Sequence, residues 1–268
     1  MRSALPVATT LFASHHHEVR RQSGPAGNRQ SLRPVWCRAC GERCLLADPA
    51  GGRHALLGTN GAGKSTLFNA ICGTVPVSAG DVRFQGIRLA HLAVHARARL
   101  GIGRTFQTSL CFGDRSVADN LRVALAGRAG PRFGLNAWPT YGAIGERLEN
   151  VLERFALKPV SELPVGSLSY GQQREVEIAM ALAAEPTLLL LDEPAAGMSP
   201  SGRVELLGRL RALPRSVTLL FVEHDMDVAL ALADEVTVMR DGQVVASGTP
   251  EQIRSNELVR EMYLGAEH

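Results

Sequence analysis

A glycine-rich loop of the phosphate-binding type constrains this chain more than any other feature. Residues 58–66 read Gly-Thr-Asn-Gly-Ala-Gly-Lys-Ser-Thr, a complete P-loop pattern of the form G-x-x-x-x-G-K-[ST]. The glycines let successive backbone N–H groups point at phosphate oxygens, Lys64 supplies a cation for the β- and γ-phosphates, and the Ser65 hydroxyl can ligate Mg²⁺. An apolar run at 53–57 precedes the loop and a helical pattern at 67–71 follows it, an order that a chance glycine-rich turn would lack. The predicted phosphate contacts are Gly58, Thr59, Asn60, Gly61, Ala62, Gly63, Lys64, Ser65 and Thr66.

Length, composition and charge place the chain among ordinary globular proteins. Its 268 residues can bury a sizeable core, and 45% hydrophobic with 21% charged residues is usual for a soluble protein. The net charge of +3 and the absence of a long basic run argue against a nucleic-acid partner. No apolar stretch reaches the roughly 18–20 residues that span a bilayer, so we expect any membrane role to come through a partner. Five cysteines, an odd count, and no plausible signal peptide favour reduced thiols in the cytoplasm.

A second acidic motif follows a run of four leucines at residues 188–191. The run predicts a buried parallel strand, and Asp192 and Glu193 come at its carboxyl end, where ligands bind in open α/β sheets. Asp192 is placed to hold Mg²⁺, directly or through water. Glu193 is placed to polarise a water for attack on a γ-phosphate. Such a strand alone would be weak evidence, but downstream of a P-loop it is strong.

The segment Leu-Ser-Tyr-Gly-Gln at 168–172 opens a long helical pattern at 173–184. Here the chain resembles the ATP-binding cassette (ABC) ATPases, whose signature motif is Leu-Ser-Gly-Gly-Gln. The resemblance implies that this helix N-terminus contacts the γ-phosphate of an ATP held by the opposite subunit. Tyr170 departs from the commonest form, at a position where the family tolerates variation. The signature residues expected to contact nucleotide are Ser169, Gly171 and Gln172.

Two further segments match motifs of this family. Arg-Thr-Phe-Gln at 104–107 resembles the Q-loop, which implies that Gln107 contacts Mg²⁺ or water and reports the nucleotide state to a transmembrane partner. Phe-Val-Glu-His-Asp at 221–225 resembles the switch motif, which implies that His224 hydrogen-bonds the γ-phosphate and orients Glu193. A lone histidine would more often be structural, but its place at the end of an apolar strand favours the functional interpretation. The D-loop position, 195–200, lacks the aspartate often found there.

The resemblance covers roughly residues 50–265 and narrows to the ATPase subunits of bacterial branched-chain amino acid importers; related members serve urea, short amides or other small polar solutes. The segments that carry it are 101–107, 170–173, 192–198, 222–226 and the terminal Met-Tyr-Leu-Gly at 262–265.

This family implies an α/β fold of the P-loop NTPase (RecA-like) type, with a mostly parallel sheet, an inserted helical lobe and a small antiparallel β region. In this chain we expect the antiparallel region to be incomplete at the N-terminus. It implies ATP and Mg²⁺ as cofactors, and a dimer that sandwiches two ATP molecules. The expected partners are a second ABC ATPase subunit, two membrane permease subunits and, indirectly, a solute-binding protein. The expected location is peripheral, on the cytoplasmic face of the plasma membrane. Rival interpretations are a soluble ABC protein acting on DNA or ribosomes, for which no coiled coil or basic face is visible, and an inactive product of a damaged gene.

Alternating patterns organise the rest of the ATPase domain, which we expect to span residues 50–265. Residues 110–172 form the expected helical lobe, with a helical pattern at 146–155 and a loop at 127–145. Trp138 and Tyr141 in that loop serve either local packing or a partner contact. A short strand is predicted at 81–85. Further predictions are strands at 187–191, 217–222 and 235–239, helices at 200–212 and 225–233, and a hairpin turn at Asp241-Gly242 leading to a strand at 243–247.

Residues 1–49 do not fit the family. Its members begin with antiparallel strands and an aromatic residue that stacks on adenine, but the corresponding position, 23 residues before Gly58, is Val35, and no strand alternation is visible. One interpretation is a metal site formed by Cys37, Cys40 and Cys44 with the histidines at 15–17. A second is a divergent or disordered extension. A third is a frameshift, because back-translating 35–48 and dropping one base permits the family pattern in register, with the true frame restored near Pro49.

Overall fold

The computed structural model describes residues 35–37, 44–46, 51–77, 81–105, 111–129 and 141–264, all within one compact unit, Ser31–His268. Several predictions of the sequence lie outside these residues. They are the Q-loop residue Gln107, Trp138, Gly265, Cys40, the histidines at 15–17 and most of the segment 1–49.

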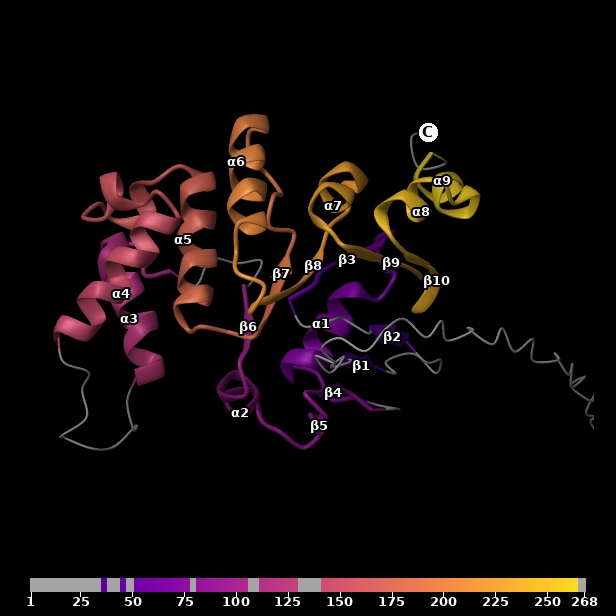
Figure 1. The fold of residues 1–268 in the computed structure, drawn as a ribbon, viewed down its shortest axis with the longest axis horizontal. Coiled ribbons are helices and arrows are strands. Elements are labelled where there is room, and N and C mark those ends of the chain that lie inside the picture. Colours follow the sequence, from indigo (N-terminus) through magenta and orange to yellow (C-terminus); the bar gives the residue numbers. More distant parts are fainter. Residues whose placement is uncertain are drawn as a thin grey trace, which may run out of the picture. The chain divides into compact units, whose positions relative to one another are not determined.

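A six-stranded, mostly parallel sheet forms the centre of this unit, in the order β10-β9-β3-β8-β7-β6 (Figure 1). Parallel pairing joins β9 to β3, β3 to β8, β8 to β7 and β7 to β6, while β10 returns antiparallel to β9. The strands are β3 (Arg53–Gly58), β6 (Ile102–Arg104), β7 (Leu188–Asp192), β8 (Thr218–Val222), β9 (Glu235–Arg240) and β10 (Gln243–Gly248). The interior strands β7 and β8 are nearly continuous apolar runs, as expected where both faces of the sheet are covered. The predicted α/β fold with its mostly parallel sheet is confirmed.

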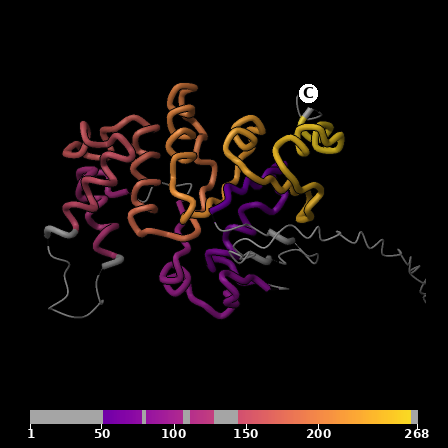
Figure 2. The backbone as a smooth tube through the Cα atoms, viewed as in Figure 1, coloured from indigo at the N-terminus to yellow at the C-terminus, as the bar shows by residue number. Residues whose placement is uncertain are grey.

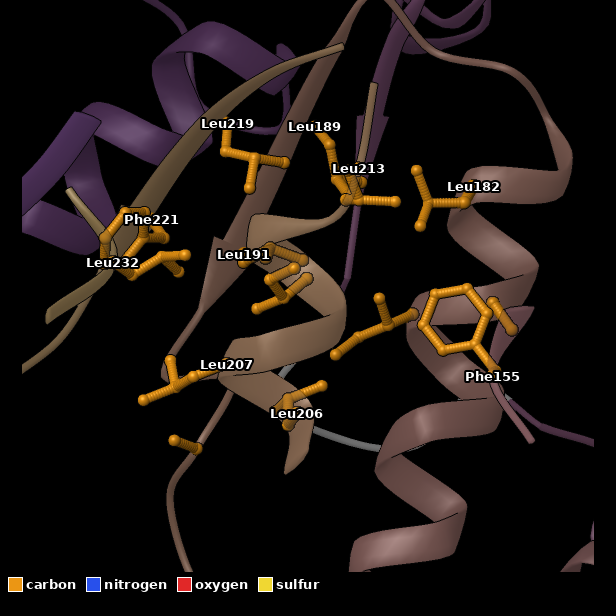
Figure 3. Packing of buried hydrophobic residues seen from close by; sticks show 14 of the residues in the cluster. Phe155, Leu182, Leu189, Leu191, Leu206, Leu207, Leu213, Leu219, Phe221 and Leu232 are labelled. Carbon is orange, nitrogen blue, oxygen red and sulfur yellow. The ribbon is translucent and has the colours of Figure 1, made fainter. Parts of the chain in front are cut away.

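Alternate residues of each strand enter two separate cores, since successive side chains point to opposite faces. On one face, Leu189, Leu191 and Phe221 pack in a cluster with helices α5 (Tyr170–Ala183), α6 (Pro200–Arg211) and α7 (Met226–Leu232). Figure 3 shows Leu206 and Leu207 of α6 in this cluster together with Leu191 and Phe221 of the strands, with Phe221 next to Leu232 of α7.

The opposite face of the sheet packs on the helix that follows the P-loop. Leu188, Leu190 and Leu220 point into a second cluster with Leu67 and Phe68 of α1 (Lys64–Cys72). The same cluster continues into a four-stranded antiparallel sheet, so that α1 has sheet residues on two sides (Figure 1). The P-loop is thus fixed at its downstream end by a helix buried on both sides.

The small antiparallel sheet is better formed than the sequence suggested. Its order is β2-β1-β4-β5, from Cys44–Leu46, Val35–Cys37, Arg83–Phe84 and Ile87–Arg88. Two of these strands lie in the segment where no alternation was visible, because three residues are too few to establish a period of two. The strand expected at 81–85 shortens to β4, since Gln85 and Gly86 have positive φ angles of 52° and 81° and form a tight hairpin turn.

The helical lobe contains α3 (Val117–Ala129), α4 (Tyr141–Arg154) and the short 3₁₀ turns η1 (Lys158–Val160) and η2 (Val165–Ser167), and it packs on α5 (Figure 2). The predicted loop at 127–145 was too long at both ends, because α3 continues to Ala129 and α4 begins at Tyr141. Glycines weaken a helix, but burial of Leu148 and Leu152 outweighs that propensity. The remaining helices are α2 (Val94–Arg99), α8 (Pro250–Arg254) and α9 (Glu257–Leu264). No described helix is long and apolar enough to cross a bilayer.

Candidate functional site

The P-loop connects β3 to α1 in a conformation that requires glycine at two positions. Gly58 has φ 150°, and a Cβ there would lie 2.2 Å from the carbonyl oxygen of Met239. Gly63 has φ 95° and precedes the first turn of α1, where no side chain caps the free N–H groups. These N–H groups and the positive end of the helix dipole form a ready site for anions. Ser65 and Thr66 lie in that first turn and are exposed.

Lys64 is folded back over the loop. Its ammonium donates to the carbonyl oxygens of Gly58 at 2.6 Å and Thr59 at 2.9 Å. Burial lowers the pKa of Lys64, and the carboxylates of Glu193 and Asp192 oppose that shift. The cation therefore lies between the loop and the acidic end of β7, where the phosphates of a nucleotide would compete for it.

Asp192 ends β7 with its side chain only 2% exposed. One carboxylate oxygen, Oδ2, lies 3.7 Å from Arg104 Nη2, while Oδ1 is buried with no hydrogen-bond partner among the described residues. Burial raises the pKa of Asp192, and the Arg104 charge opposes this. A buried oxygen without a partner can accept a hydrogen bond from a metal-bound water or bind a metal ion directly. Mg²⁺ prefers oxygen ligands such as carboxylates and hydroxyls. Asp192 and Ser65 thus fit the predicted metal role.

Glu193 has a left-handed backbone, with φ 49°, that places its carboxylate beside the switch histidine. His224 Nε2 lies 3.2 Å from Glu193 Oε2, which brings the two predicted catalytic side chains into contact. The Glu193 N–H donates to the Val222 carbonyl at 3.0 Å, so the ends of β7 and β8 are tied together.

Arg174 of α5 fixes the same backbone from the other side. Its Nη2 donates to the carbonyl oxygen of Asp192 and, at 3.3 Å, to that of Glu193, while its Nη1 pairs with Glu177 at 2.6 Å. Sequence reasoning missed this residue. The one available signal was a group of three charged residues, Arg174, Glu175 and Glu177, at the start of a helical pattern that is otherwise mostly apolar.

Glu223 is a second buried group that sequence reasoning missed, although it precedes His224 in the switch motif. Its side chain is buried, and Oε1 accepts the Ala195 N–H at 3.3 Å. Burial raises the pKa of Glu223 to about 7, and the Ala195 hydrogen bond opposes the shift. The segment after Glu193, in the D-loop position, is thereby held to the end of β8.

The signature motif forms the start of α5. Ser169 caps the helix: its Oγ accepts the Gln172 N–H at 3.4 Å, and Gln172 Oε1 accepts the Ser169 N–H at 3.1 Å. Gly171 lies in the first turn. Within the described part of the chain, no hydrogen bond or ion pair joins Ser169, Gly171 or Gln172 to the P-loop.

Comparison with known proteins agrees with this geometry. The ABC transporter family model matches residues 46–196, and the model described as branched-chain amino acid ATP-binding cassette transporter matches residues 243–268. The chain is 37% identical over 220 residues to the high-affinity branched-chain amino acid transport ATP-binding protein BraF of Pseudomonas aeruginosa, with 79% of this chain and 86% of that protein covered. It is 37% identical over 219 residues to LivG of Escherichia coli K12, a protein of the same description, with the same coverage.

Among solved structures, a nucleotide-free ATP-binding cassette from an ABC transporter matches with a TM-score of 0.71 and 27% identity, covering 86% of this chain and 97% of that one. The chain therefore matches most of the length of these relatives. Its P-loop, the acidic end of β7 and the switch histidine all lie within this ATP-binding cassette fold. The chain belongs to the ABC transporter family, as an ATP-hydrolysing cassette.

Proposed function

We propose that this chain is the ATPase subunit of a branched-chain amino acid importer, with Glu193 and His224 acting on the water that attacks the γ-phosphate. The observation that carries the proposal is their 3.2 Å contact at the ends of neighbouring parallel strands. Glu193 would accept a proton from the water, and His224 would orient Glu193 and hydrogen-bond the γ-phosphate. The left-handed backbone at Glu193 supports this assignment, because such conformations in non-glycine residues cluster at functional sites.

The other site residues have binding roles in this proposal. Lys64 would leave the Gly58 and Thr59 carbonyls for the β- and γ-phosphates, and the P-loop N–H groups would hold the phosphate oxygens. Ser65 and Asp192 would hold Mg²⁺, which neutralises phosphate charge when bound, with Gln107 as a further contact. Ser169, Gly171 and Gln172 would contact the nucleotide of a second cassette. The capped N-terminus of α5 forms no hydrogen bond or ion pair with its own P-loop among the described residues, which supports a role across such a dimer.

Branched-chain amino acids are the proposed solute because two lines converge. BraF and LivG are named for high-affinity branched-chain amino acid transport, and the C-terminal family model carries the same description. We further propose two permease subunits and a solute-binding protein as partners, with the chain peripheral to the cytoplasmic face of the membrane. Co-purification of the chain with its permease, followed by reconstituted uptake, tests this. Uptake of urea or amides in preference to leucine would assign the alternative solute class.

Replacing Glu193 by Gln tests the catalytic assignment. Glu193→Gln keeps the size and hydrogen-bonding reach of the side chain but removes the proton acceptor, so ATP affinity should stay within about threefold while turnover falls by about 10²–10⁴. ATP binding by calorimetry and phosphate release measure the two quantities. Glu153→Gln, at an exposed position of α4, is the matched control and should turn over normally. Full turnover by Glu193→Gln would refute the role of Glu193.

We also propose that the ATPase domain spans residues 50–265, with 110–172 as its helical lobe, and that residues 1 to about 48 are translated out of frame. The ABC family match begins at residue 46, close to the point where the frame would be restored. Resequencing the gene decides this. An intact, unambiguous frame would refute the frameshift and leave the metal site and the divergent or disordered extension as the alternatives.

A further inference from the structure

The C-terminal helix α9 reaches the first glycine of the P-loop. The Gly58 N–H donates to the Tyr263 hydroxyl oxygen at 2.9 Å, across 205 positions of sequence. Tyr263 belongs to the terminal motif at 262–265 that the sequence analysis singled out, and to the segment matched by the C-terminal family model. Tyr263 has none of the binding or catalytic roles proposed above.

The helix is anchored well enough to hold this contact in place. Val259 is completely buried in the larger core, and Met262 and Tyr263 pack against the same cluster. Burial raises the pKa of the Tyr263 phenol, so the group keeps its proton at neutral pH. A neutral hydroxyl still offers lone pairs, and it accepts the Gly58 hydrogen bond without adding a negative charge next to a phosphate site.

A second C-terminal contact supports the other end of the loop. Gly242, in the tight turn between β9 and β10, donates its N–H to the Ala62 carbonyl at 3.1 Å. Gly58 also lies directly against β9, where it pairs with Met239, and a Cβ on Gly58 would clash with the Met239 carbonyl oxygen. Segments that follow residue 238 therefore touch the P-loop at its start and near its end.

The Lys64 hydrogen bonds indicate when the tyrosine matters most. Gly58 is held through its carbonyl by Lys64 and through its N–H by Tyr263. When the ammonium turns to a nucleotide phosphate, the carbonyl loses this partner. The Tyr263 hydroxyl is then the side-chain contact that still fixes Gly58.

We propose that Tyr263 is a positioning residue for the P-loop, which keeps the first peptide of the loop in the conformation that receives nucleotide phosphates. This inference rests on the proposed nucleotide site and adds the C-terminal segment to it. The Tyr263 hydroxyl contacts the backbone of Gly58 and not the carboxyl end of β7, where Glu193 lies, so its effect should fall on binding and not on the chemical step.

Tyr263→Phe is the direct test, because it keeps the ring and removes only the acceptor. The Gly58 N–H then lacks its acceptor and the loop loses a contact that holds its phosphate-binding conformation, so affinity for ATP and for ADP should fall about tenfold, with kcat at saturation changed less than twofold. Ile253→Val is the matched control, since it removes one methyl group from a fully buried position of α8 away from the loop. It should lower the melting temperature but leave both affinities unchanged.

Two results would overturn the proposal: unchanged affinities in Tyr263→Phe, or an equal loss in Ile253→Val. Exchange of the Gly58 amide proton gives a readout that is independent of nucleotide. It should accelerate in Tyr263→Phe and not in Ile253→Val. If the unmodified chain binds no nucleotide, the proposed function fails, and amide exchange then decides the positioning role alone: faster exchange supports it and unchanged exchange refutes it.

Discussion

Glu193 is the residue at which backbone strain and proposed chemistry coincide. A left-handed conformation costs a non-glycine residue about 1–2 kcal/mol, so it persists only where neighbouring groups hold it. Here the Val222 carbonyl and the Arg174 guanidinium do so. Arg174 lies on the helix whose N-terminus carries the signature motif. The helix that would serve the nucleotide of a second cassette therefore also holds the Glu193 backbone of its own site.

Arg174→Lys should separate the positioning of Glu193 from nucleotide binding. A lysine ammonium cannot reproduce the planar fork that spans two carbonyls and a carboxylate, so we expect turnover to fall about tenfold while ATP affinity stays within about twofold. Arg211→Lys, at an exposed position of α6, is the control for the same exchange. Steady-state ATPase assays and calorimetry measure both variants. Normal turnover in Arg174→Lys would show that the Glu193 backbone does not depend on the guanidinium.

The contrast between predicted and unpredicted residues has a physical cause. Lys64, Asp192, Glu193 and His224 were predictable because phosphate and water chemistry demands those side chains at fixed places in a strand–loop–helix order. Arg174 and Glu223 could not be predicted in this way, because their side chains hydrogen-bond backbone groups. Almost every residue carries a backbone carbonyl and N–H group, whatever its side chain. The sequence therefore does not show which backbone group a distant side chain will bind.

At the scale of elements, the length of an apolar run decided what the sequence could predict. The predicted bounds of three of the longer elements are accurate to one residue: β7 and β8 begin one residue later than predicted, and α6 ends one residue sooner. The agreement is close because each of these elements has a continuous buried run or a clear buried face. The two- and three-residue strands of the antiparallel sheet carry no such pattern. Their pairing comes from contacts with α1 and with one another, which only the folded chain provides.

The two ends of helix α1 differ in how their free backbone groups are satisfied. Its N-terminus is open to phosphates, while its C-terminus receives the buried Arg97 guanidinium of α2. Arg97 Nη1 donates to the carbonyl oxygens of Ala70 at 2.5 Å and Ile71 at 2.8 Å, and Nε donates to that of Leu92 at 2.9 Å. A cation at a helix C-terminus also favours the helix dipole.

Replacing Arg97 by Met should destabilise the whole fold, because it leaves these buried carbonyls without a donor. We expect the free energy of unfolding to fall by about 2–4 kcal/mol, measured by urea denaturation of the full chain. Arg99→Met, on the same helix but exposed, should change it by less than about 0.5 kcal/mol. Equal losses in the two variants would show that the α1 cap contributes nothing beyond the surface charge.

At the scale of the whole molecule, two buried groups give the fold opposite responses to pH. Nε2 of His54, in β3, forms a hydrogen bond with Thr237 Oγ1 at 2.9 Å. Burial lowers the pKa of His54 from 6.5 to about 4. The unfolded chain therefore binds more protons between those values, and His54 makes stability rise with pH. Burial raises the pKa of Glu223 from 4.5 to about 7, so the native state binds more protons there and stability falls as pH rises.

Because the two windows overlap from about pH 4.5 to 6.5, the slopes oppose each other, and Glu223→Gln should expose the histidine contribution. The amide oxygen can still accept the Ala195 N–H, but the group no longer titrates. Relative to the unmodified chain, the variant should gain stability as pH rises from 4.5 to 7, by at most about 1.4 kcal/mol per pH unit and on the order of 2 kcal/mol in total. Urea denaturation at intervals of half a pH unit measures this difference, with Glu153→Gln as the control for losing an exposed carboxylate. A difference that stays constant with pH would mean that Glu223 is ionised in the native state, in which case the buried carboxylate beside His224 would carry a full negative charge next to Glu193.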